Sequence, residues 1–213
     1  MGRLPLDPAG WIPSMIAAAA LIAGLALAWP WLWAPALAVL AALAGFFRDP
    51  ERAVPARAGA VVAPADGLVD TIAVNRDPER GEDGGPMISI FLSVLDVHVN
   101  RAPCPGTIES TRHQPGRFMN AMKPHCAQSN ECNWIFMRDA GGRRVTVRQI
   151  AGLIARRIVC RVAPGEMVER GQRIGIIRFG SRTELYLPAG SKVDVRIGQR
   201  VKGASTIVAW MPE

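Results

Sequence analysis

Ile177-Arg178-Phe179-Gly180-Ser181-Arg182 is the stretch on which the organisation of the chain depends. Glycine has no Cβ, so Gly180 leaves its own carbonyl unshielded and permits backbone angles that are closed to other residues. The Ser181 hydroxyl lies within reach of that carbonyl, and its attack would convert the amide into an ester. β-Elimination and hydrolysis would then release ammonia and leave a pyruvoyl group on the new N-terminus. A Gly-Ser pair alone is more often an ordinary turn.

The composition of the 213 residues indicates one substantial domain plus an appendage. Hydrophobic residues make up 49% of the chain and the mean hydropathy is positive, which is high for a protein that lies wholly in water. The formal net charge of +7 predicts an anionic partner, which could be nucleic acid or an anionic membrane surface. Composition does not choose between these two partners.

The cysteines show no Cys-x-x-Cys pair and no disulfide-dense spacing; they are Cys104, Cys126, Cys132 and Cys160. This pattern predicts mostly buried, reduced thiols in a cytosolic domain. Cys126 and Cys132 could be grouped with His113 and His125 in a metal site, but the spacing fits no zinc pattern. We therefore expect no metal.

A run without any Asp, Glu, Lys or Arg extends from Trp11 to Phe47 and predicts a membrane segment. One span needs about 20 apolar residues, so this run is too long for a single straight helix. Its centre, Trp29-Pro30-Trp31-Leu32-Trp33, predicts a bend, because proline interrupts helices and tryptophan favours the membrane interface. We expect a hairpin of two short helices, roughly 14–28 and 32–47, with a single kinked span as the alternative.

The charges around this run predict its topology. Arg3 precedes it, and Arg48, Arg52 and Arg57 follow it, which places both ends in the cytoplasm under the positive-inside tendency. A cleaved signal peptide is not expected, because the run is too long and no small-residue cleavage pattern follows it. We therefore expect an anchor over 1–47 in the cell (inner) membrane and a domain over 48–213 on its cytoplasmic face.

Beyond the linker at 50–55, short β-like runs alternate with glycine and proline. The chain lacks the strand-helix alternation of a doubly wound fold, so we expect a mainly β domain, a compact antiparallel barrel or sandwich. Residues 165–174 and 198–203 form a faint repeat of strand-turn units. The first unit resembles the glycine pattern of lipoyl- or biotinyl-type domains, although it lacks their exposed modified lysine.

Four motifs behind the apolar segment carry a family resemblance. In chain order they are Pro64-Ala65-Asp66-Gly67, Asp96-Val97-His98-Val99-Asn100-Arg101-Ala102-Pro103, Ser129-Asn130-Glu131 and Phe179-Gly180-Ser181-Arg182. Together with Phe46-Phe47-Arg48-Asp49-Pro50, they make the chain similar to phosphatidylserine decarboxylase proenzymes of the short branch. Long-branch members usually carry Gly-Ser-Thr and a second histidine where this chain has Arg182 and Arg101, so no role is assigned to a second histidine.

The resemblance implies self-cleavage between Gly180 and Ser181 into a large chain, 1–180, and a small chain, 181–213, that form a heterodimer. It further implies an arrangement of Asp66, His98 and Ser181 for that cleavage. Serine needs an adjacent base, and histidine is suited to this role near neutral pH. Asp96 precedes His98 by two residues on a segment expected to be extended, so their side chains would share a face. Asp66 or Asp96 would then orient the imidazole.

The implied reaction converts phosphatidylserine into phosphatidylethanolamine and CO2 in phospholipid biosynthesis. The pyruvoyl carbonyl at residue 181 would form a Schiff base with the substrate amine, no external cofactor would be required, and His98 is a candidate proton donor. The anionic headgroup needs cations nearby. The candidates are Arg101, Arg112, Arg117 and Lys123, and each of them could equally belong to a solvated face.

Two other classes of protein remain to be weighed. A non-enzymatic, membrane-anchored β adaptor of the lipoyl-like kind would explain the anchor and the glycine repeats, but it gives no reason for Asp66, His98 and Gly180-Ser181 to occur together. A nucleic-acid-binding domain is disfavoured, because the cations are scattered and the aromatic residues concentrate in the apolar run. Within the enzyme class, another lipid with a serine headgroup is an alternative substrate.

Overall fold

The computed structural model describes residues 6–76, 83–119, 129–153, 157–178 and 181–212. The chain divides into two compact units, Met1–Glu51 and Arg52–Glu213. The first unit is built from helices and the second from strands. The prediction of a mainly β, antiparallel protein with apolar helices at its N-terminus is therefore confirmed.

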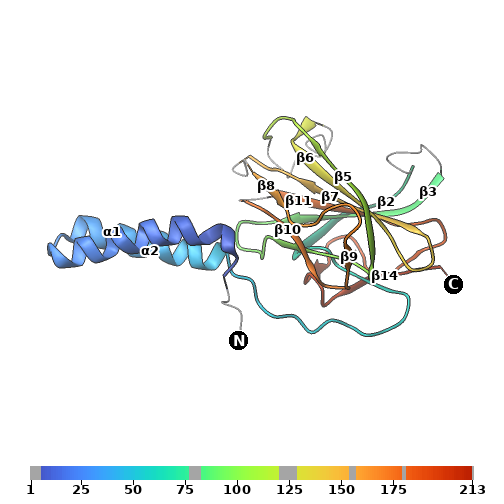
Figure 1. Cartoon of the computed structure of the whole chain (residues 1–213), viewed down its shortest axis with the longest axis horizontal. Helices are drawn as coiled ribbons and strands as arrows, with labels where there is room; N and C mark the ends of the chain where they lie inside the picture. Colours follow the sequence, from blue (N-terminus) through green and yellow to red (C-terminus); the bar gives the residue numbers. More distant parts are fainter. Residues whose placement is uncertain (1–5, 77–82, 120–128, 154–156, 179–180, 213) are drawn as a thin grey trace. The chain divides into compact units, whose positions relative to one another are not determined.

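Two apolar helices form the first unit, α1 (Trp11–Ala26) and α2 (Pro30–Phe46). They lie side by side as a hairpin in Figure 1 and are joined at the predicted bend around Trp29. Both helices begin and end within a few residues of the expected positions. The segment Pro8–Ala26 is long and apolar enough to cross a membrane, whereas α2 is a shorter apolar helix.

A short 3-10 helix, η1 (Pro8–Gly10), precedes α1. The Asp7 carboxylate caps η1 by accepting a hydrogen bond from the Ala9 backbone N–H at 2.9 Å. Proline at the first position of η1 suits a helix start, because that position needs no backbone donor.

The described residues of the second unit form three antiparallel sheets, drawn in Figure 1. The largest has the strand order β13-β2-β3-β11-β7-β6-β5-β9, and the two smaller sheets have the orders β1-β14-β12 and β4-β10-β8. The strand bounds are β1 Ala60–Val62, β2 Gly67–Arg76, β3 Asp83–Leu92, β4 Val99–Arg101, β5 Gly106–Gln114, β6 Cys132–Arg138, β7 Arg144–Ile150, β8 Ile158–Cys160, β9 Met167–Val168, β10 Arg173–Ile177, β11 Ser181–Tyr186, β12 Lys192–Val193, β13 Arg200–Val201 and β14 Ile207–Trp210. The lipoyl-like relation of the two short repeats stays a prediction.

Strand β11 lies in the middle of the large sheet, with β3 on one side and β7 on the other. Its alternate residues face opposite sides of the sheet. Leu185 packs in the main hydrophobic core with Ile88 and Val147, its partners on the two neighbouring strands. We call the side of the sheet on which Leu185 meets the core the inner side. Ser181 and Thr183 lie on the inner side, whereas Arg182 and Glu184 lie on the opposite, outer side.

Gly67 opens β2 in the Pro64-Ala65-Asp66-Gly67 motif and brings this strand close to β3. Its φ is +151°, and a Cβ added there would lie 2.2 Å from the Phe91 carbonyl oxygen. Phe91 in turn pairs with Arg182 on β11. Glycine at this position therefore permits the close approach of a strand that supports the start of β11.

We predict that Gly67→Ala lowers the free energy of unfolding by about 3 kcal/mol or more, because the new methyl group overlaps a backbone carbonyl at an unfavourable φ. Gly142→Ala is the matched control: its φ is +75°, but nothing lies within 4 Å of an added Cβ. The control should lose only about 1–2 kcal/mol. Thermal unfolding of both purified variants in detergent measures the difference, and equal losses would contradict the close approach.

Candidate functional site

Ser181 is the first residue of β11, where it pairs with Leu92 on β3. The residue is fully buried, and its Oγ has no hydrogen-bond partner in the part of the chain that the structure describes. An unsatisfied buried hydroxyl costs about 1–3 kcal/mol, so its presence calls for an explanation. Gly180, the other half of the predicted cleavage site, lies outside the described residues.

His98 is fully buried just before β4. Its Nδ1 lies 2.9 Å from the backbone carbonyl oxygen of Asp96. A carbonyl only accepts, so Nδ1 carries the hydrogen in the neutral ring and Nε2 carries the lone pair. The His98 carbonyl accepts a hydrogen bond from Ile177 N at 3.3 Å. That contact places His98 beside the last residue of β10, four residues before Ser181.

The segment that precedes His98 is a turn, so the expectation of an extended stretch there is wrong. Residues 94–96 turn the chain, and the Asp96 N–H donates to the Ser93 carbonyl at 2.9 Å. Ser93 also donates to the Asp96 carboxylate from its N–H, at 2.9 Å, and from its hydroxyl, at 2.7 Å. The other carboxylate oxygen pairs with Arg200. Asp96 therefore contacts the imidazole through its backbone carbonyl.

Asp66 is held by two partners of its own. Arg52 pairs with one carboxylate oxygen at 2.7 Å, and the Gly203 N–H donates to the other at 2.8 Å. Gly203 lies two residues beyond the end of β13, and β13 pairs with β2. This contact therefore ties the 181–213 segment to the turn before β2. The role of Asp66 in orienting His98 stays a prediction.

A chain of buried side-chain amides joins β11, which begins at Ser181, to β4, which follows His98. Asn133 donates to Gln149 at 3.0 Å, and Gln149 donates to Asn100 at 2.8 Å. Asn100 then donates to the Thr183 hydroxyl at 3.3 Å. All four residues are at most 5% exposed. Asn100 follows His98 by two residues and Thr183 follows Ser181 by two, so the chain links the two sheets beside the candidate site.

The amide chain is positioned by strand register and by one glycine. Thr183, Gln149 and Asn133 pair in a row across β11, β7 and β6. Gly175 on β10 leaves room for the Gln149 amide, because an added Cβ would lie 2.8 Å from Gln149 Nε2 and 2.4 Å from the Val159 carbonyl oxygen. Local sequence patterns do not mark these residues as members of one hydrogen-bonded chain. The alternation of side chains along each strand indicates which residues of that strand share a face of the sheet. It does not indicate which residues of other strands they contact, because these contacts join residues far apart in the sequence.

The outer side of β11 holds buried charges that are paired. Arg182 contacts Asp70 at 2.5 Å and Ser89 Oγ at 2.8 Å. Glu184 pairs with Arg148 at 3.2 Å and accepts a hydrogen bond from the Tyr186 hydroxyl at 2.7 Å. Burial and the nearby Glu184 carboxylate raise the pKa of Tyr186, which keeps the phenol protonated at neutral pH.

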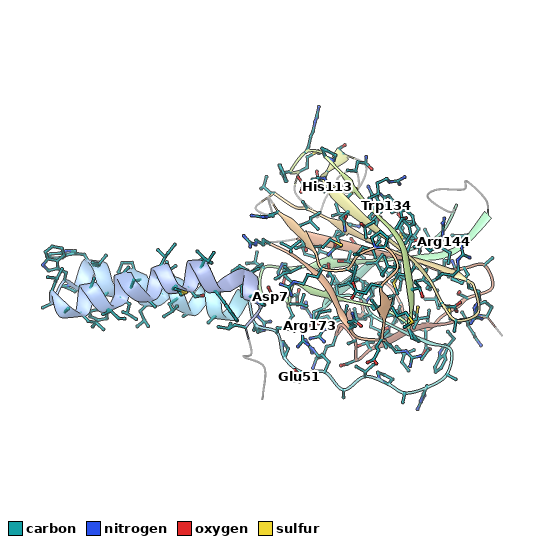
Figure 2. All side chains as sticks on the ribbon, viewed as in Figure 1. Asp7, Glu51, His113, Trp134, Arg144 and Arg173 are labelled. Atoms are coloured by element: carbon teal, nitrogen blue, oxygen red, sulfur yellow. The ribbon has the colours of Figure 1, made fainter. Side chains whose placement is uncertain are left out.

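Cations and aromatic rings cover this outer side beyond β11. The Arg148 guanidinium lies 4.4 Å from the ring centre of Trp134, one of the residues labelled in Figure 2. The Arg112 guanidinium, on β5, lies 5.7 Å from the centre of the same Trp134 ring, which is on β6. Trp134 pairs with Arg148 across β6 and β7, and Arg148 pairs with Glu184 across β7 and β11. Because Glu184 lies on the outer side of β11, this row of side chains lies on the side of the sheet opposite Ser181. Arg112, a predicted headgroup cation, therefore lies across the sheet from the serine.

The other predicted cations have different surroundings. Arg101 is 4% exposed, and its side chain donates to the Gly171 carbonyl at 3.2 Å. Arg117 is exposed, and its carbonyl accepts from Glu131 N at 3.0 Å. The Glu131 carbonyl accepts from Ala151 N at 2.9 Å. This places Arg117 near the Ser181 end of the large sheet, while Lys123 lies outside the described residues.

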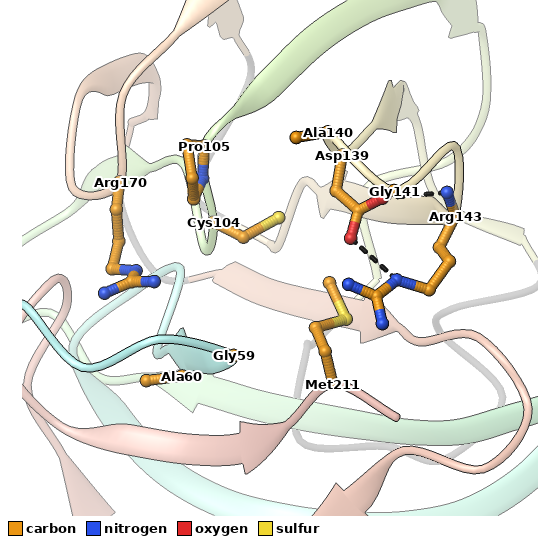
Figure 3. A pocket seen from close by; sticks show the side chains of 10 residues that line it. All are labelled: Gly59, Ala60, Cys104, Pro105, Asp139, Ala140, Gly141, Arg143, Arg170 and Met211. Atoms are coloured by element: carbon orange, nitrogen blue, oxygen red, sulfur yellow. Dashed lines mark hydrogen bonds and ion pairs between the residues drawn. The ribbon is translucent and has the colours of Figure 1, made fainter. Parts of the chain in front are cut away.

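A cavity of about 140 Å³ is found elsewhere, between the β6–β7 turn, the β4–β5 turn and the C-terminal segment. Figure 3 shows Cys104, Arg170 and the ion pair of Asp139 with Arg143, which is 2.9 Å long. Strand β7 runs from this turn to Ile150, the partner of Arg182. The cavity is thus at the opposite end of β7 from Ser181.

Chemistry at Cys104 is disfavoured by its surroundings. Burial, with a further contribution from the Asp139 carboxylate, raises the pKa of the thiol to about 12. The thiol is therefore protonated at neutral pH and is a poor nucleophile. Cys104, Cys132 and Cys160 are free thiols. Within the described ranges, no group of three or more His, Cys, Asp or Glu side chains is arranged to hold a metal ion.

Comparison with known proteins covers most of the chain. The family model for phosphatidylserine decarboxylase matches residues 39–209. A phosphatidylserine decarboxylase proenzyme of Nitrosomonas europaea is 48% identical over 84% of this chain and 83% of its own length. A protein of the same name from Mycobacterium marinum is 44% identical over 98% of this chain and 87% of its own length. Another from Burkholderia mallei is 43% identical over 96% of this chain and 94% of its own length. The chain therefore belongs to the phosphatidylserine decarboxylase family.

Proposed function

We propose that this protein cuts itself between Gly180 and Ser181 and then decarboxylates phosphatidylserine to phosphatidylethanolamine with a pyruvoyl group derived from Ser181. Family membership supports the decarboxylation of phosphatidylserine. The observation that carries the self-cleavage is the buried Ser181 Oγ, which lacks a hydrogen-bond partner among the described residues. A reactive role explains this arrangement, and the non-enzymatic adaptor hypothesis does not.

The first step is an acyl shift at residue 181. His98 Nε2 carries the lone pair, because Nδ1 donates to the Asp96 carbonyl, and it accepts the Ser181 hydroxyl proton. The oxygen attacks the Gly180 carbonyl carbon, the C–N bond breaks, and the proton passes to the released amine. The product is an ester between Gly180 and Ser181 Oγ. This assignment uses His98 and Ser181 as base and nucleophile.

The second step divides the chain. Loss of the Ser181 Cα proton expels the Gly180 carboxylate and leaves a dehydroalanine at position 181. Its hydrolysis consumes one water, releases ammonia and leaves the pyruvoyl group at the start of β11. The fully buried position of Ser181 fits this small group, since the change replaces an amine by a carbonyl oxygen without adding bulk.

The two product chains are expected to stay together as a heterodimer. Residues 181–213 contribute β11 between β3 and β7, β13 beside β2, and β14 beside β1. They pair with four strands of the 1–180 chain, β1, β2, β3 and β7. Breaking the peptide bond before β11 removes none of these strand pairings among the described residues.

When present, the pyruvoyl group supplies an electrophilic carbonyl that takes up the substrate amine and accepts the electrons released with CO2. The protein supplies the remaining functions. We assign to His98 Nε2 the delivery of the proton that replaces the carboxylate. Arg117, exposed at the Ser181 end of the sheet, is the better supported cation for the headgroup. A role for Arg101 would require its buried guanidinium to leave the Gly171 carbonyl.

We further propose that residues 1–47 anchor the enzyme in the cell membrane and that residues 48–213 act on its cytoplasmic face. The apolar helix α1 and the shorter apolar helix α2 support membrane association. Arg48, Arg52 and Arg57 after the hairpin support the cytoplasmic side under the positive-inside tendency. An anchored domain meets a substrate that never leaves the bilayer.

We predict that Ser181→Ala leaves a single uncut chain that releases no CO2, because alanine offers no nucleophile. Ser191→Ala is the matched control, since Ser191 Oγ is also buried without a partner among the described residues but lies after β11. The control should cleave and react as the unaltered protein does. Denaturing gels and CO2 release from carboxyl-labelled phosphatidylserine measure both outcomes, and a Ser181→Ala chain that still divides would overturn the proposal.

We predict that His98→Gln slows self-cleavage roughly 10²–10⁴-fold, the contribution typical of a general base. His113→Gln serves as the control, because His113 is half-exposed on β5 and lies 3.4 Å from Glu131. Pulse-labelled synthesis followed by a chase gives both cleavage rates, and thermal unfolding confirms that each variant is folded. Cleavage of folded His98→Gln at the unaltered rate would remove His98 from the base role.

A further inference from the structure

The two strands that flank β11 both run into exposed apolar loops at the Ser181 end. Strand β3 ends at Leu92, directly opposite Ser181. The turn that follows it presents Val94 and Leu95, which are 48% and 81% exposed. Strand β7 ends at Ile150, opposite Arg182.

Three residues beyond β7, the chain presents a third exposed apolar side chain, Leu153, which is 61% exposed. Leu153 and the Val94-Leu95 turn come from different strands on the two sides of β11. Isolated apolar side chains on a protein surface are ordinary. These three differ because each lies within three residues of the end of a strand that flanks β11, at the end where Ser181 lies.

Exposed arginines accompany these loops. Arg157 is exposed, and its carbonyl accepts a hydrogen bond from Arg178 N at 3.2 Å, just beyond the end of β10. Arg117 is exposed at the end of β5 and is connected through the Glu131 backbone to Ala151, two residues before Leu153. The same end of the domain therefore carries apolar tips and cations together.

We propose that this end of the domain, comprising Val94, Leu95, Leu153, Arg117 and Arg157, is a docking surface for an anionic lipid bilayer. Apolar side chains on loops enter the interfacial layer, while arginines lie at the depth of the lipid phosphates. The net charge of +7 is complementary to an anionic surface. The proposal rests on the proposed function, because a lipid substrate must present its headgroup at Ser181. It assigns the domain a membrane contact of its own, in addition to the helices.

The test compares the environment of labels at both ends of the domain. Leu95→Cys, Leu153→Cys and Met167→Cys are each made in the full-length chain with Cys126→Ala and Cys160→Ala, and are labelled with the fluorophore NBD. Met167 is the matched control: it is 82% exposed, against 81% for Leu95. It pairs with Thr107, whose partner Arg138 lies at the β6–β7 turn, the end remote from Ser181.

The labelled proteins are reconstituted in phosphatidylcholine vesicles with phosphatidylglycerol, with and without a doxyl-labelled lipid as quencher. We expect NBD at positions 95 and 153 to be quenched at least roughly twofold more than NBD at position 167, because only the first two enter the interfacial layer. Omitting phosphatidylglycerol should reduce this difference. Equal quenching at all three positions, or stronger quenching at 167, would overturn the docking surface.

Activity measured separately keeps this proposal distinct from the proposed function. Unlabelled Leu95→Ser/Leu153→Ser should show a severalfold higher apparent KM for phosphatidylserine in vesicles and an unchanged kcat for short-chain phosphatidylserine in detergent. Met167→Ser should change neither value. If the unaltered protein releases no CO2 in either assay, the proposed function fails. If it is active and the double variant matches it in vesicles, only the docking surface fails.

Discussion

The pairing of β11 on both of its edges is the constraint on which the rest of the site depends. Strand β3 holds it on one side from Ser181 to Tyr186, and β7 holds it on the other. Buried ion pairs from Arg182 and Glu184 add contacts on the outer side. A residue at the start of such a strand has a fixed position before and after its preceding peptide bond is cut. The proposed self-cleavage would therefore create a reactive group without moving it.

On the inner side of β11, a serine hydroxyl with no hydrogen-bond partner among the described residues lies beside a chain of hydrogen-bonded polar side chains. Buried amides are tolerated when each finds a partner, and the hydrogen bonds from Asn133 through Gln149 and Asn100 to Thr183 meet that condition. Hydrogen bonds are directional, unlike apolar packing. This polar chain can thus hold β4, the strand that follows His98, in place against β11, the strand that begins at Ser181. Ser181 Oγ has no such partner among the described residues, and it is the group that we propose as the nucleophile.

Much of the architecture could be predicted from local patterns. The run from Trp11 to Phe47 lacks charge, which indicates apolar helices, and the glycine- and proline-punctuated runs beyond it indicate antiparallel strands. The contact of His98 with the Asp96 backbone could not be predicted, because Ser93 and Arg200 occupy the Asp96 carboxylate and residues 94–96 turn. The hydrogen bond from Gln149 to Asn100 could not be predicted from local sequence patterns either, because it joins residues of two different sheets.

The mass of the purified protein, recorded under native and then denaturing conditions, tests the central claim most directly. The account predicts one native complex that separates on denaturation into residues 1–180 and a fragment beginning at position 181. That fragment should carry a ketone in place of the amine of a serine-started peptide. It should also form a hydrazone with a hydrazine reagent. A single full-length mass from folded, membrane-reconstituted protein would contradict the account, because the bond before Ser181 would then be an ordinary peptide bond.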